Sequence, residues 1–248
     1  MKTKKKWFES WFDSPYYHVL YRERDEKEAK LFLDNLILFL KPLPGAKILD
    51  VACGKGRHSV YLNQKGFDVA AFDLSPENIE FDQQFENEKL SFFLHDMRNL
   101  FRINYYDFVF NLFTSFGYFE KENDNVKTIF ASAQSLKPGG MLVIDYMNSE
   151  KVKASIIQDQ SKKINGIEFH IHKKIEDGFV MKKISFTDKG KFYEFSERLS
   201  LLGKPDFENY FSRYNLSITN SFGDYNLNAY DEKTSDRLIL IAKKPTTN

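Results

Sequence analysis

The residues that could do chemistry are concentrated in residues 48–59, whose sequence is Ile-Leu-Asp-Val-Ala-Cys-Gly-Lys-Gly-Arg-His-Ser. Asp50 lies near the end of an apolar run, Gly54 and Gly56 follow it, and Asp73 lies at the end of the next apolar run. In an open α/β sheet, a glycine turn lets the backbone approach a ligand, and the next helix directs its N-terminus toward that ligand. An acidic side chain at the end of the second strand can accept hydrogen bonds from both ribose hydroxyls. The spacing therefore predicts a site for an adenosine-type nucleoside.

Two other nucleotide-binding loops match this segment less well. A dinucleotide-binding loop has the pattern G-x-G-x-x-G or A, in which the third small residue permits close helix packing, whereas Ser59 occupies that position here. A Walker-type loop requires Lys and then Ser or Thr after its second glycine, and Arg57 and His58 follow Gly56 instead. Nucleoside triphosphate hydrolysis is therefore disfavoured, and an NAD-dependent oxidoreductase is kept as a weaker alternative.

Four motifs, taken in order, resemble those of the class I S-adenosylmethionine-dependent methyltransferases. Asp50-x-Ala52-x-Gly54-x-Gly56 is similar to the family's first motif, usually D/E-x-G-x-G-x-G, with alanine in place of one glycine. His95-Asp96-Met97 resembles the third motif, and Asn111-Leu112-Phe113 resembles the segment that lines the methionine part of the cofactor. Lys137-Pro138-Gly139-Gly140 is similar to the turn before the fifth strand. The resemblance covers residues 46–148 and the last two expected strands.

The resemblance implies that the cofactor is S-adenosyl-L-methionine. It also implies that Asp73 holds the ribose, that Asp96 faces the adenine amino group and that Met97 contacts the adenine ring. The cofactor-binding residues that it implies are Asp50, Ala52, Cys53, Gly54, Gly56, Asp73, Leu74, Asp96, Met97, Asn111 and Phe113.

The methyl acceptor is expected to be a small molecule. Residues 151–203 and the tyrosines Tyr16, Tyr17 and Tyr21 are similar to segments that roof the active site in a subgroup of small-molecule methyltransferases. Since the cofactor carries the activated methyl group, the protein must align the acceptor, exclude water and take a proton where the nucleophile begins protonated. An oxygen and a nitrogen acceptor are both left open, and the candidates for a base are Tyr118, His58 and Tyr17. The residues expected at the mouth of the site are Asn111, Thr114, Ser115, Phe116, Tyr118, Asp145 and Asn148.

Some of these residues have simpler interpretations. Cys53 is more often a small packed residue than a nucleophile, and the absence of a second cysteine argues against covalent methylation of cytosine. His58 can simply cap or solvate the start of its helix. His170 and His172 share one face of an expected strand, but with no third ligand in view a solvent-exposed or lid face is favoured. We therefore expect no metal site.

The elements that must position these residues alternate between strand and helix over the first 148 residues. Short apolar runs predict strands at residues 46–51, 67–72, 90–94, 107–112 and 141–146. Helical spacing of apolar residues predicts helices at residues 26–40, 57–64 and 121–136, with another opening at Pro76. This order is typical of an α/β, doubly wound, mostly parallel seven-stranded sheet of the Rossmann-like type.

The pattern changes after residue 148. Residues 167–174, 179–186 and 191–199 alternate apolar and polar side chains between hairpin turns, which predicts an inserted antiparallel β meander. A helix at 206–214 and strands at 216–222 and 237–243 then return to the main sheet. We expect an N-terminal helical segment or lid (1–45), a cofactor-binding methyltransferase domain (46–150 and 204–248) and the inserted meander (151–203), which would serve as a substrate lid or an interface.

Composition narrows the partners and the compartment. The 248 residues carry 36 Lys and Arg against 35 Asp and Glu, so no overall field attracts nucleic acid or an anionic membrane. A single cysteine excludes an internal disulfide and a thiolate metal cluster, which fits a reducing cytoplasm. No long apolar segment follows the basic N-terminus, and the uncharged residues 108–119 are too few to span a membrane. A cytoplasmic monomer or homodimer is expected.

A second functional class fits the same motifs. A non-catalytic sensor of S-adenosylmethionine or S-adenosylhomocysteine would need the same pocket, would use the meander as a protein interface and would show no turnover. Methylation of a small metabolite distinguishes an enzyme from such a sensor.

Overall fold

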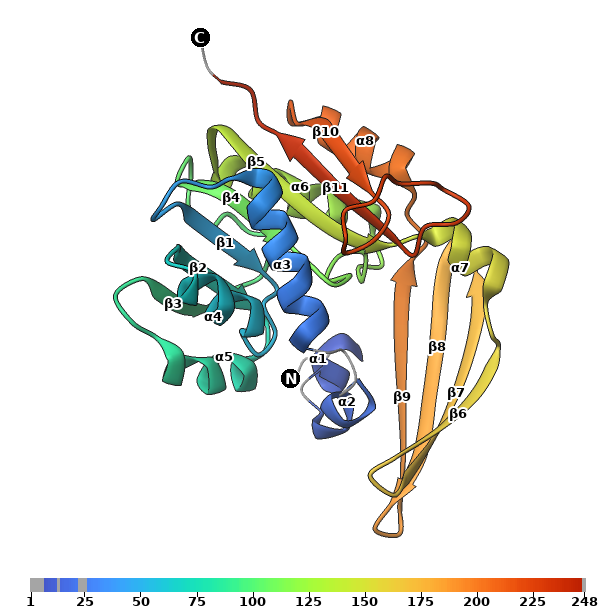
Figure 1. Ribbon diagram of the computed structural model, residues 1–248. Helices are drawn as coiled ribbons and strands as arrows, with labels where there is room; N and C mark the ends of the chain where they lie inside the picture. The colour runs from blue at the N-terminus through green and yellow to red at the C-terminus, as the bar shows by residue number, and fades with distance from the viewer. Residues whose placement is uncertain (1–6, 13, 22–25, 247–248) are drawn as a thin grey trace.

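The computed structural model describes residues 7–12, 14–21 and 26–246 and arranges them around two separate sheets (Figure 1). The larger sheet has the strand order β10 (Ser217–Phe222), β11 (Arg237–Lys243), β5 (Leu136–Met147), β4 (Tyr106–Asn111), β1 (Lys47–Val51), β2 (Asp68–Asp73) and β3 (Leu90–Leu94). β11 is antiparallel to β5 and to β10, and the other neighbouring strands are parallel. The prediction of a mostly parallel, seven-stranded sheet is confirmed.

Helices on both faces explain why the central strands are continuous apolar runs. One face is covered by α3 (Glu26–Leu40), α4 (Arg57–Gln64) and α5 (Pro76–Asp82), and the other by α6 (Glu122–Ser135) and α8 (Lys204–Ser212). A short 3-10 helix, Gln83–Phe85, follows α5. On β1, Ile48 packs in the cluster that contains Phe32 and Leu62, whereas Leu49 packs in the cluster of Ile129 and Phe207. Successive residues of the strand therefore have to be apolar.

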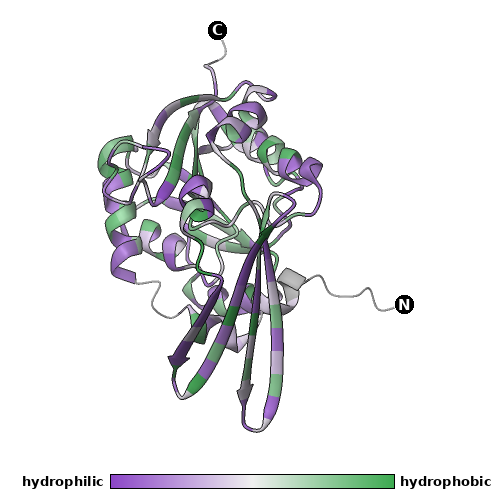
Figure 2. Ribbon diagram, turned by 90° about the vertical axis from the view of Figure 1, so that its right-hand side faces the viewer, coloured by the Kyte–Doolittle hydropathy of each residue, from purple (hydrophilic) through white to green (hydrophobic). Residues whose placement is uncertain are grey.

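The smaller sheet is antiparallel and projects from the body of the molecule (Figure 1). It follows α7 (Ser149–Ser155) and contains β6 (Asp159–Ile164), β7 (Ile167–Glu176), β8 (Phe179–Asp188) and β9 (Lys191–Ser200) in this order. Hydrophilic and hydrophobic residues alternate along these strands (Figure 2). Phe169 and Ile184 on its buried face pack against Trp11 of α1 (Trp7–Phe12) and Leu20 of α2 (Pro15–Leu20). The inserted sheet therefore carries the N-terminal helices.

Two elements, α7 and β6, were not expected, and several boundaries differ from the expected ones. β6 was not expected, because Asp159–Ile164 is mostly polar; it is an outer strand held to β7 by backbone pairing. β5 begins at Leu136 instead of residue 141, because Leu136 already pairs with Tyr106 of β4, and regular pairing resumes at Met141 after a shift in register. α8 begins at Lys204 instead of residue 206, since Asp206 accepts a hydrogen bond from the Gly203 N–H at 2.7 Å and caps the helix.

The order of the strands creates a crevice beside β1. The chain passes from β1 to β2 and β3 on one side and then crosses to β4 on the other. At such a reversal, loops at the carboxyl ends of the strands separate and leave room for a ligand. Among the described residues, no helix has both the length and the apolar composition needed to cross a membrane.

Candidate active site

A cavity of about 360 Å³ lies at the carboxyl ends of β1 to β4, and residues of α1 and α2 line one side of it. It is lined by most of the residues expected to bind the cofactor: Asp50, Ala52, Cys53, Gly54, Asp73, Leu74, Asp96, Met97 and Phe113. Gly56 and Asn111 do not line it. Gly56 lies next to the side chains of Phe92 and Asp82. The buried Asn111 donates from Nδ2 to the Val51 carbonyl at 3.3 Å.

The loop after β1 has a backbone that few residues tolerate. Ala52, Gly54 and Gly56 all have left-handed φ values, of 60°, 58° and 62°. A Cβ atom on Gly56 would lie 2.7 Å from Cε1 of Phe92, so glycine is required there for space as well as for conformation. Ala52, which replaces the family's usual glycine, adopts the same conformation at a cost of about 1–2 kcal/mol. The alternation of left-handed residues turns the loop around the mouth of the cavity.

The Asp73 carboxylate is fixed between two loops. Its Oδ2 accepts a hydrogen bond from the Gly54 N–H at 2.9 Å, and its Oδ1 accepts one from the Ser75 N–H at 2.9 Å. Ser75 in turn caps α5, because its Oγ accepts from the Asn78 N–H at 3.2 Å. The carboxylate that ends β2 is thereby held at the cavity by the loop after β1 and by the start of α5.

Three carboxylates gather at this loop. Asp50 is buried and accepts a hydrogen bond from the Ser59 hydroxyl at 2.6 Å, and burial raises its pKa to about 6. Asp82 lies next to Gly56. Burial, the larger cause, and the charge of Asp73 raise its pKa to about 8. Its Oδ1 has no hydrogen-bond partner among the described residues. With these pKa values, Asp82 is mostly protonated at neutral pH and Asp50 is mostly ionised. The remaining negative charge, in a poorly hydrated place, favours a ligand that carries positive charge, as a sulfonium does.

The Cys53 thiol is packed beside these carboxylates. Its Sγ lies 3.9 Å from Oδ2 of Asp82 and 3.7 Å from the Gly54 carbonyl oxygen. Burial raises the pKa of the thiol well above its usual value. The thiol is therefore protonated and is a poor nucleophile.

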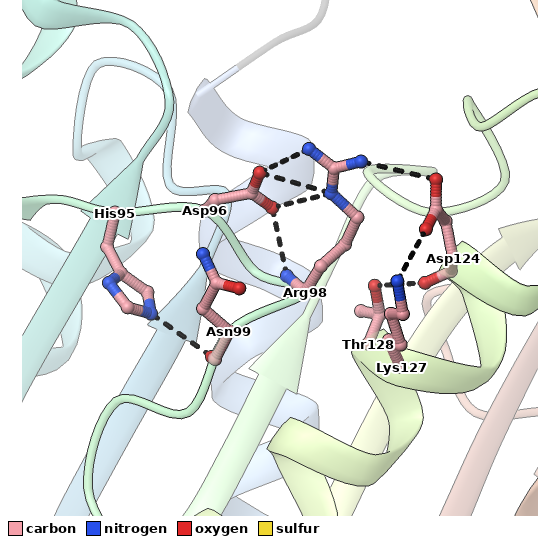
Figure 3. Close-up of polar contacts among 7 residues, drawn as sticks. All are labelled: His95, Asp96, Arg98, Asn99, Asp124, Lys127 and Thr128. Atoms are coloured by element: carbon pink, nitrogen blue, oxygen red, sulfur yellow. Dashed lines mark hydrogen bonds and ion pairs between the residues drawn. The ribbon is translucent and has the colours of Figure 1, made fainter.

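The segment after β3 places Asp96 at the cavity, with its carboxylate turned toward Arg98 (Figure 3). The Asp96 carboxylate is bound by the Arg98 guanidinium and by the Arg98 N–H, and Arg98 continues to Asp124 of α6. His95 also lines the cavity, and its Nε2 lies 3.1 Å from the Asn99 carbonyl oxygen. Sequence alone had not pointed to Arg98 or Asp124, because neither lies in a recognisable motif position.

His58 forms a wall of the cavity with Phe113. The two rings are stacked with centroids 4.8 Å apart, and the Arg57 guanidinium lies 4.6 Å from the Phe113 centroid. Burial and the neighbouring Arg57 charge lower the pKa of His58 to about 3. The interpretation of His58 as a solvated helix end is wrong, because Phe113, which folds back from the loop after β4, covers the ring. His58 is neutral and weakly basic.

Several residues expected at the mouth lie beneath it. Asp145 is fully buried, and its Oδ1 lies 2.7 Å from Nη2 of Arg237. Its Oδ2 accepts from the Phe113 N–H at 2.7 Å, and Arg237 Nη2 also donates to the Thr114 hydroxyl at 2.9 Å. This network holds Phe113 and Thr114 at left-handed φ values of 54° and 60°. The expectation for Asp145 and Thr114 is therefore wrong, because Arg237, distant in sequence, draws both inward.

Asn111, Phe116 and Asn148 are also buried away from the mouth. Phe116 packs in the core with Phe207, and Asn148 donates from Nδ2 to the carbonyls of Glu232 and Ser235 at 2.8 Å. Ser115 and Tyr118 do line the cavity, as expected.

The roof of the cavity, formed by α1 and α2, contributes Phe12, Tyr17 and His18, with Tyr21 directly after α2. Tyr17 contacts Phe12 edge-on at 5.1 Å, and Phe12 contacts Tyr118 edge-on at 5.3 Å. Tyr118, His58 and Tyr17, the candidate bases, therefore all lie at the same cavity.

Contacts with the inserted sheet anchor this roof. Glu197 of β9 accepts hydrogen bonds from Trp11 Nε1 and from the Tyr21 hydroxyl, both at 2.6 Å. The Tyr16 hydroxyl donates to Asp188 at 2.8 Å. Tyr21 also contacts Lys182, which lies 3.4 Å from Glu197. The inserted sheet thus fixes the helices that cover the cavity.

His170 and His172 lie far from this cavity, on the exposed face of the inserted sheet. His170 Nδ1 lies 3.0 Å from the Ser161 hydroxyl and His172 Nδ1 lies 2.8 Å from Asp159. Within the part of the chain that the structure describes, no group of three or more potential metal ligands is found.

Comparisons with known proteins agree with this architecture. A family model described as a methyltransferase domain matches residues 43–198. A glycine/sarcosine N-methyltransferase of Parasynechococcus marenigrum is 27% identical over 224 residues, which are 85% of this chain and 76% of that protein. The putative methyltransferase YqeM of Bacillus subtilis is 35% identical over 118 residues, which are 46% of this chain and 47% of that protein, so the match spans about half its length.

A solved structure shows the same fold over nearly the whole chain. The crystal structure of an S-adenosylmethionine-dependent methyltransferase from Clostridium acetobutylicum superposes with a TM-score of 0.78 at 22% identity. The match covers 93% of this chain and 96% of that one. With its family match over residues 43–198, its mostly parallel sheet and its cavity at the strand ends, the chain belongs to the class I S-adenosylmethionine-dependent methyltransferases.

Proposed function

We propose that the nucleoside of S-adenosylmethionine lies against the carboxyl ends of β2 and β3. The placement of Asp73 supports this, because its carboxylate is held at the cavity and can accept hydrogen bonds from two ribose hydroxyls. Asp96 would face the adenine amino group, and Met97 would contact the ring. The methionine part would extend over the loop after β1 toward Phe113, past the Asp50 carboxylate, which lines the cavity.

The acceptor site would lie between Phe113 and the roof. The roof supplies Phe12, Tyr17 and Tyr21 and closes the cavity over a molecule of limited size. The relative named as a glycine/sarcosine N-methyltransferase acts, by that name, on small amino acids. We therefore infer that the acceptor is a small molecule whose nucleophilic atom is an oxygen or a nitrogen.

A nitrogen acceptor is favoured by the weak basicity of the imidazoles near the acceptor. Burial lowers the pKa of His18, and burial with the Arg57 charge lowers that of His58 to about 3. A hydroxyl acceptor needs a base that removes its proton as the bond forms, whereas a neutral amine already carries a lone pair. Tyr17 and Tyr118 can orient the acceptor by hydrogen bonds, and α1 and α2 exclude water.

The bound cofactor supplies a methyl group activated by its positively charged sulfur. In the proposed transfer, a bond forms between the acceptor nitrogen and the methyl carbon while the bond between sulfur and that carbon breaks. The methylated ammonium product then releases its proton to solvent. This scheme requires no protein base. It therefore agrees with the low basicity of His58, which is the observation that carries this choice of acceptor.

Labelled methyl transfer tests the proposal. The protein is incubated with methyl-labelled S-adenosylmethionine and two panels, one of small primary and secondary amines and one of phenols and alcohols. We expect label in amine products together with S-adenosylhomocysteine. Label in hydroxyl products alone would contradict the nitrogen acceptor. Tight cofactor binding with no turnover in fractionated cell metabolites would favour the sensor alternative.

We also propose the division of the chain into residues 1–45, 46–150 with 204–248, and 151–203. Residues 151–203 contain β6 to β9, and residues 1–45 contain the helices that these strands support. The inserted sheet would then act as the platform of a substrate lid.

A further inference from the structure

A half-buried network of charges joins Asp96, Arg98 and Asp124 beside the cavity (Figure 3). Arg98 Nε lies 3.0 Å from Oδ1 and 3.1 Å from Oδ2 of Asp96, and Arg98 Nη2 lies 2.5 Å from Oδ2. The Arg98 N–H donates to Oδ1 at 3.0 Å. The side chains of Arg98 and Asp96 are 22% and 20% exposed, so the pair is shielded from water on most sides.

Arg98 also contacts the two walls that follow β4. Its Nη1 lies 3.2 Å from Oδ2 of Asp124 in the first turn of α6. The guanidinium lies 5.0 Å from the centroid of Phe119, which lines the cavity. Lys127 lies 3.4 Å from the other Asp124 oxygen and is largely exposed. One guanidinium therefore joins the loop after β3, the loop after β4 and the start of α6.

The geometry of the contact determines what Asp96 can recognise. A guanidinium fork fixes the plane of a carboxylate, whereas an ammonium leaves it free to rotate. An ionised carboxylate held in one plane presents acceptor lone pairs alone to the cavity. A ligand that donates a hydrogen there gains a bond, whereas a ligand that presents a carbonyl oxygen meets repulsion between lone pairs.

We propose that Arg98 is a positioning residue that makes the cofactor site selective for a purine with a 6-amino group. Arg98 holds the Asp96 carboxylate in one orientation, and its contacts with Asp124 of α6 and with Phe119 hold Arg98 itself in place. This inference rests on the proposed placement of adenine beside Asp96. It adds a residue, Arg98, and a specificity, amino against carbonyl, to that placement.

Binding of two ligands tests the proposal without knowledge of the acceptor. S-adenosylhomocysteine and S-inosylhomocysteine differ in that a carbonyl oxygen replaces the 6-amino group. Titration calorimetry measures both dissociation constants for the unchanged protein and for Arg98→Ala, Arg98→Lys, Asp96→Asn and Lys127→Ala. We expect the unchanged protein to prefer the adenosine ligand by at least about tenfold, the value of one hydrogen bond to a charged group.

The ratio of the two constants is the decisive readout. Arg98→Ala should bring the ratio near one, mainly by weakening the binding of the adenosine ligand. Arg98→Lys should give an intermediate ratio, because it restores the positive charge without the planar fork of the guanidinium. Lys127→Ala, the matched control in the same network, should keep the full ratio. Asp96→Asn should lose the preference, since its amide can donate to the carbonyl.

Different failures have different meanings. If Arg98→Ala and Arg98→Lys weaken both ligands by the same factor, Arg98 has a structural role alone and the inference is wrong. If Arg98→Ala does not fold, an unchanged ratio in Arg98→Lys likewise shows that the inference is wrong. If the unchanged protein binds neither ligand, the proposed function itself fails. If it binds both equally, adenine is not beside Asp96.

Discussion

The two sides of the cavity are held in place by contacts of very different range. On the nucleoside side, the loops after β1, β2 and β3, the fixing contacts are short or intermediate in range: Ser75 binds Asp73 at a separation of 2 residues, Gly54 binds it at 19, and Arg98 binds Asp96 at 2. On the roof side, Trp11 binds Glu197 at a separation of 186 residues and Tyr16 binds Asp188 at 172. The nucleoside side is therefore built by the sheet itself, whereas the roof exists through packing with an inserted sheet.

This difference suggests that the two sides serve different needs. In the proposed function, loops at strand ends would match a cofactor of constant structure, whereas an acceptor would enter and leave beneath the roof. A roof held by a few side-chain contacts can be altered without change in the central sheet. If the two sides are independent, a substitution can damage either one without the other.

The largest expected effect is on the nucleoside side. Asp73→Ala should weaken binding of S-adenosylhomocysteine roughly 100-fold, about 3 kcal/mol, because the hydrogen bonds to ribose are lost. Titration calorimetry measures the change. Asp68→Ala, at the other end of β2 where Asp68 pairs with Lys47, is the control and should leave the affinity unchanged. If Asp73→Ala and the unchanged protein bind S-adenosylhomocysteine with equal affinity, Asp73 does not bind the ribose.

The glycine loop offers a matched pair of substitutions. Gly56→Ala should lower the free energy of unfolding by about 2–3 kcal/mol, because the new Cβ meets Phe92 and the backbone is left-handed. Gly54→Ala has the same backbone penalty but open space around the Cβ, so about 1 kcal/mol is expected. Urea unfolding measures both. Equal losses would show that the space beneath the loop is unimportant.

A substitution that loosens the roof should leave the nucleoside side of the cavity intact. Glu197→Ala removes the acceptor of Trp11 and Tyr21 and the partner of Lys182, which we expect to weaken the attachment of α1 and α2 by about 2 kcal/mol. Hydrogen exchange in both helices should accelerate while the affinity for S-adenosylhomocysteine changes less than about threefold. Glu194→Ala on the same strand, which breaks an exposed pair with Lys183, is the control. A large loss of cofactor affinity in Glu197→Ala would show that the two sides of the cavity are not independent.

The smallest effect concerns pH. The raised pKa of Asp82, about 8 in the folded chain, means that the stability from its protonated form is full below the unfolded pKa and is lost as pH rises toward 8. Between about pH 6 and pH 7, the unchanged protein should lose about 1 kcal/mol relative to Asp82→Asn. Thermal or urea unfolding of both proteins measures this difference. A constant difference across this range would show that the Asp82 carboxyl titrates normally.

The difference in contact range also explains which parts could be predicted. The parallel strands were identified because each is an apolar run buried on both faces, and Asp73 was located because it ends such a run. Asp145 and Asn148 were placed at the mouth because they also end or follow a strand. The structure turns them inward because Arg237 and the carbonyls of Glu232 and Ser235 bind them. Nothing local to β5 indicates these partners.

The sequence alone determined the seven-stranded sheet, the glycine loop and the acidic strand ends, because periodicity and turn chemistry act over a few neighbouring residues. Tertiary structure decided the rest: that Phe113 covers His58, that Arg98 reaches Asp124 and Phe119, and that Glu197 holds the roof. Each of these contacts joins segments whose meeting depends on the whole fold. Burial then decides the charge of the groups involved, since the same imidazole or carboxyl titrates differently when water is excluded.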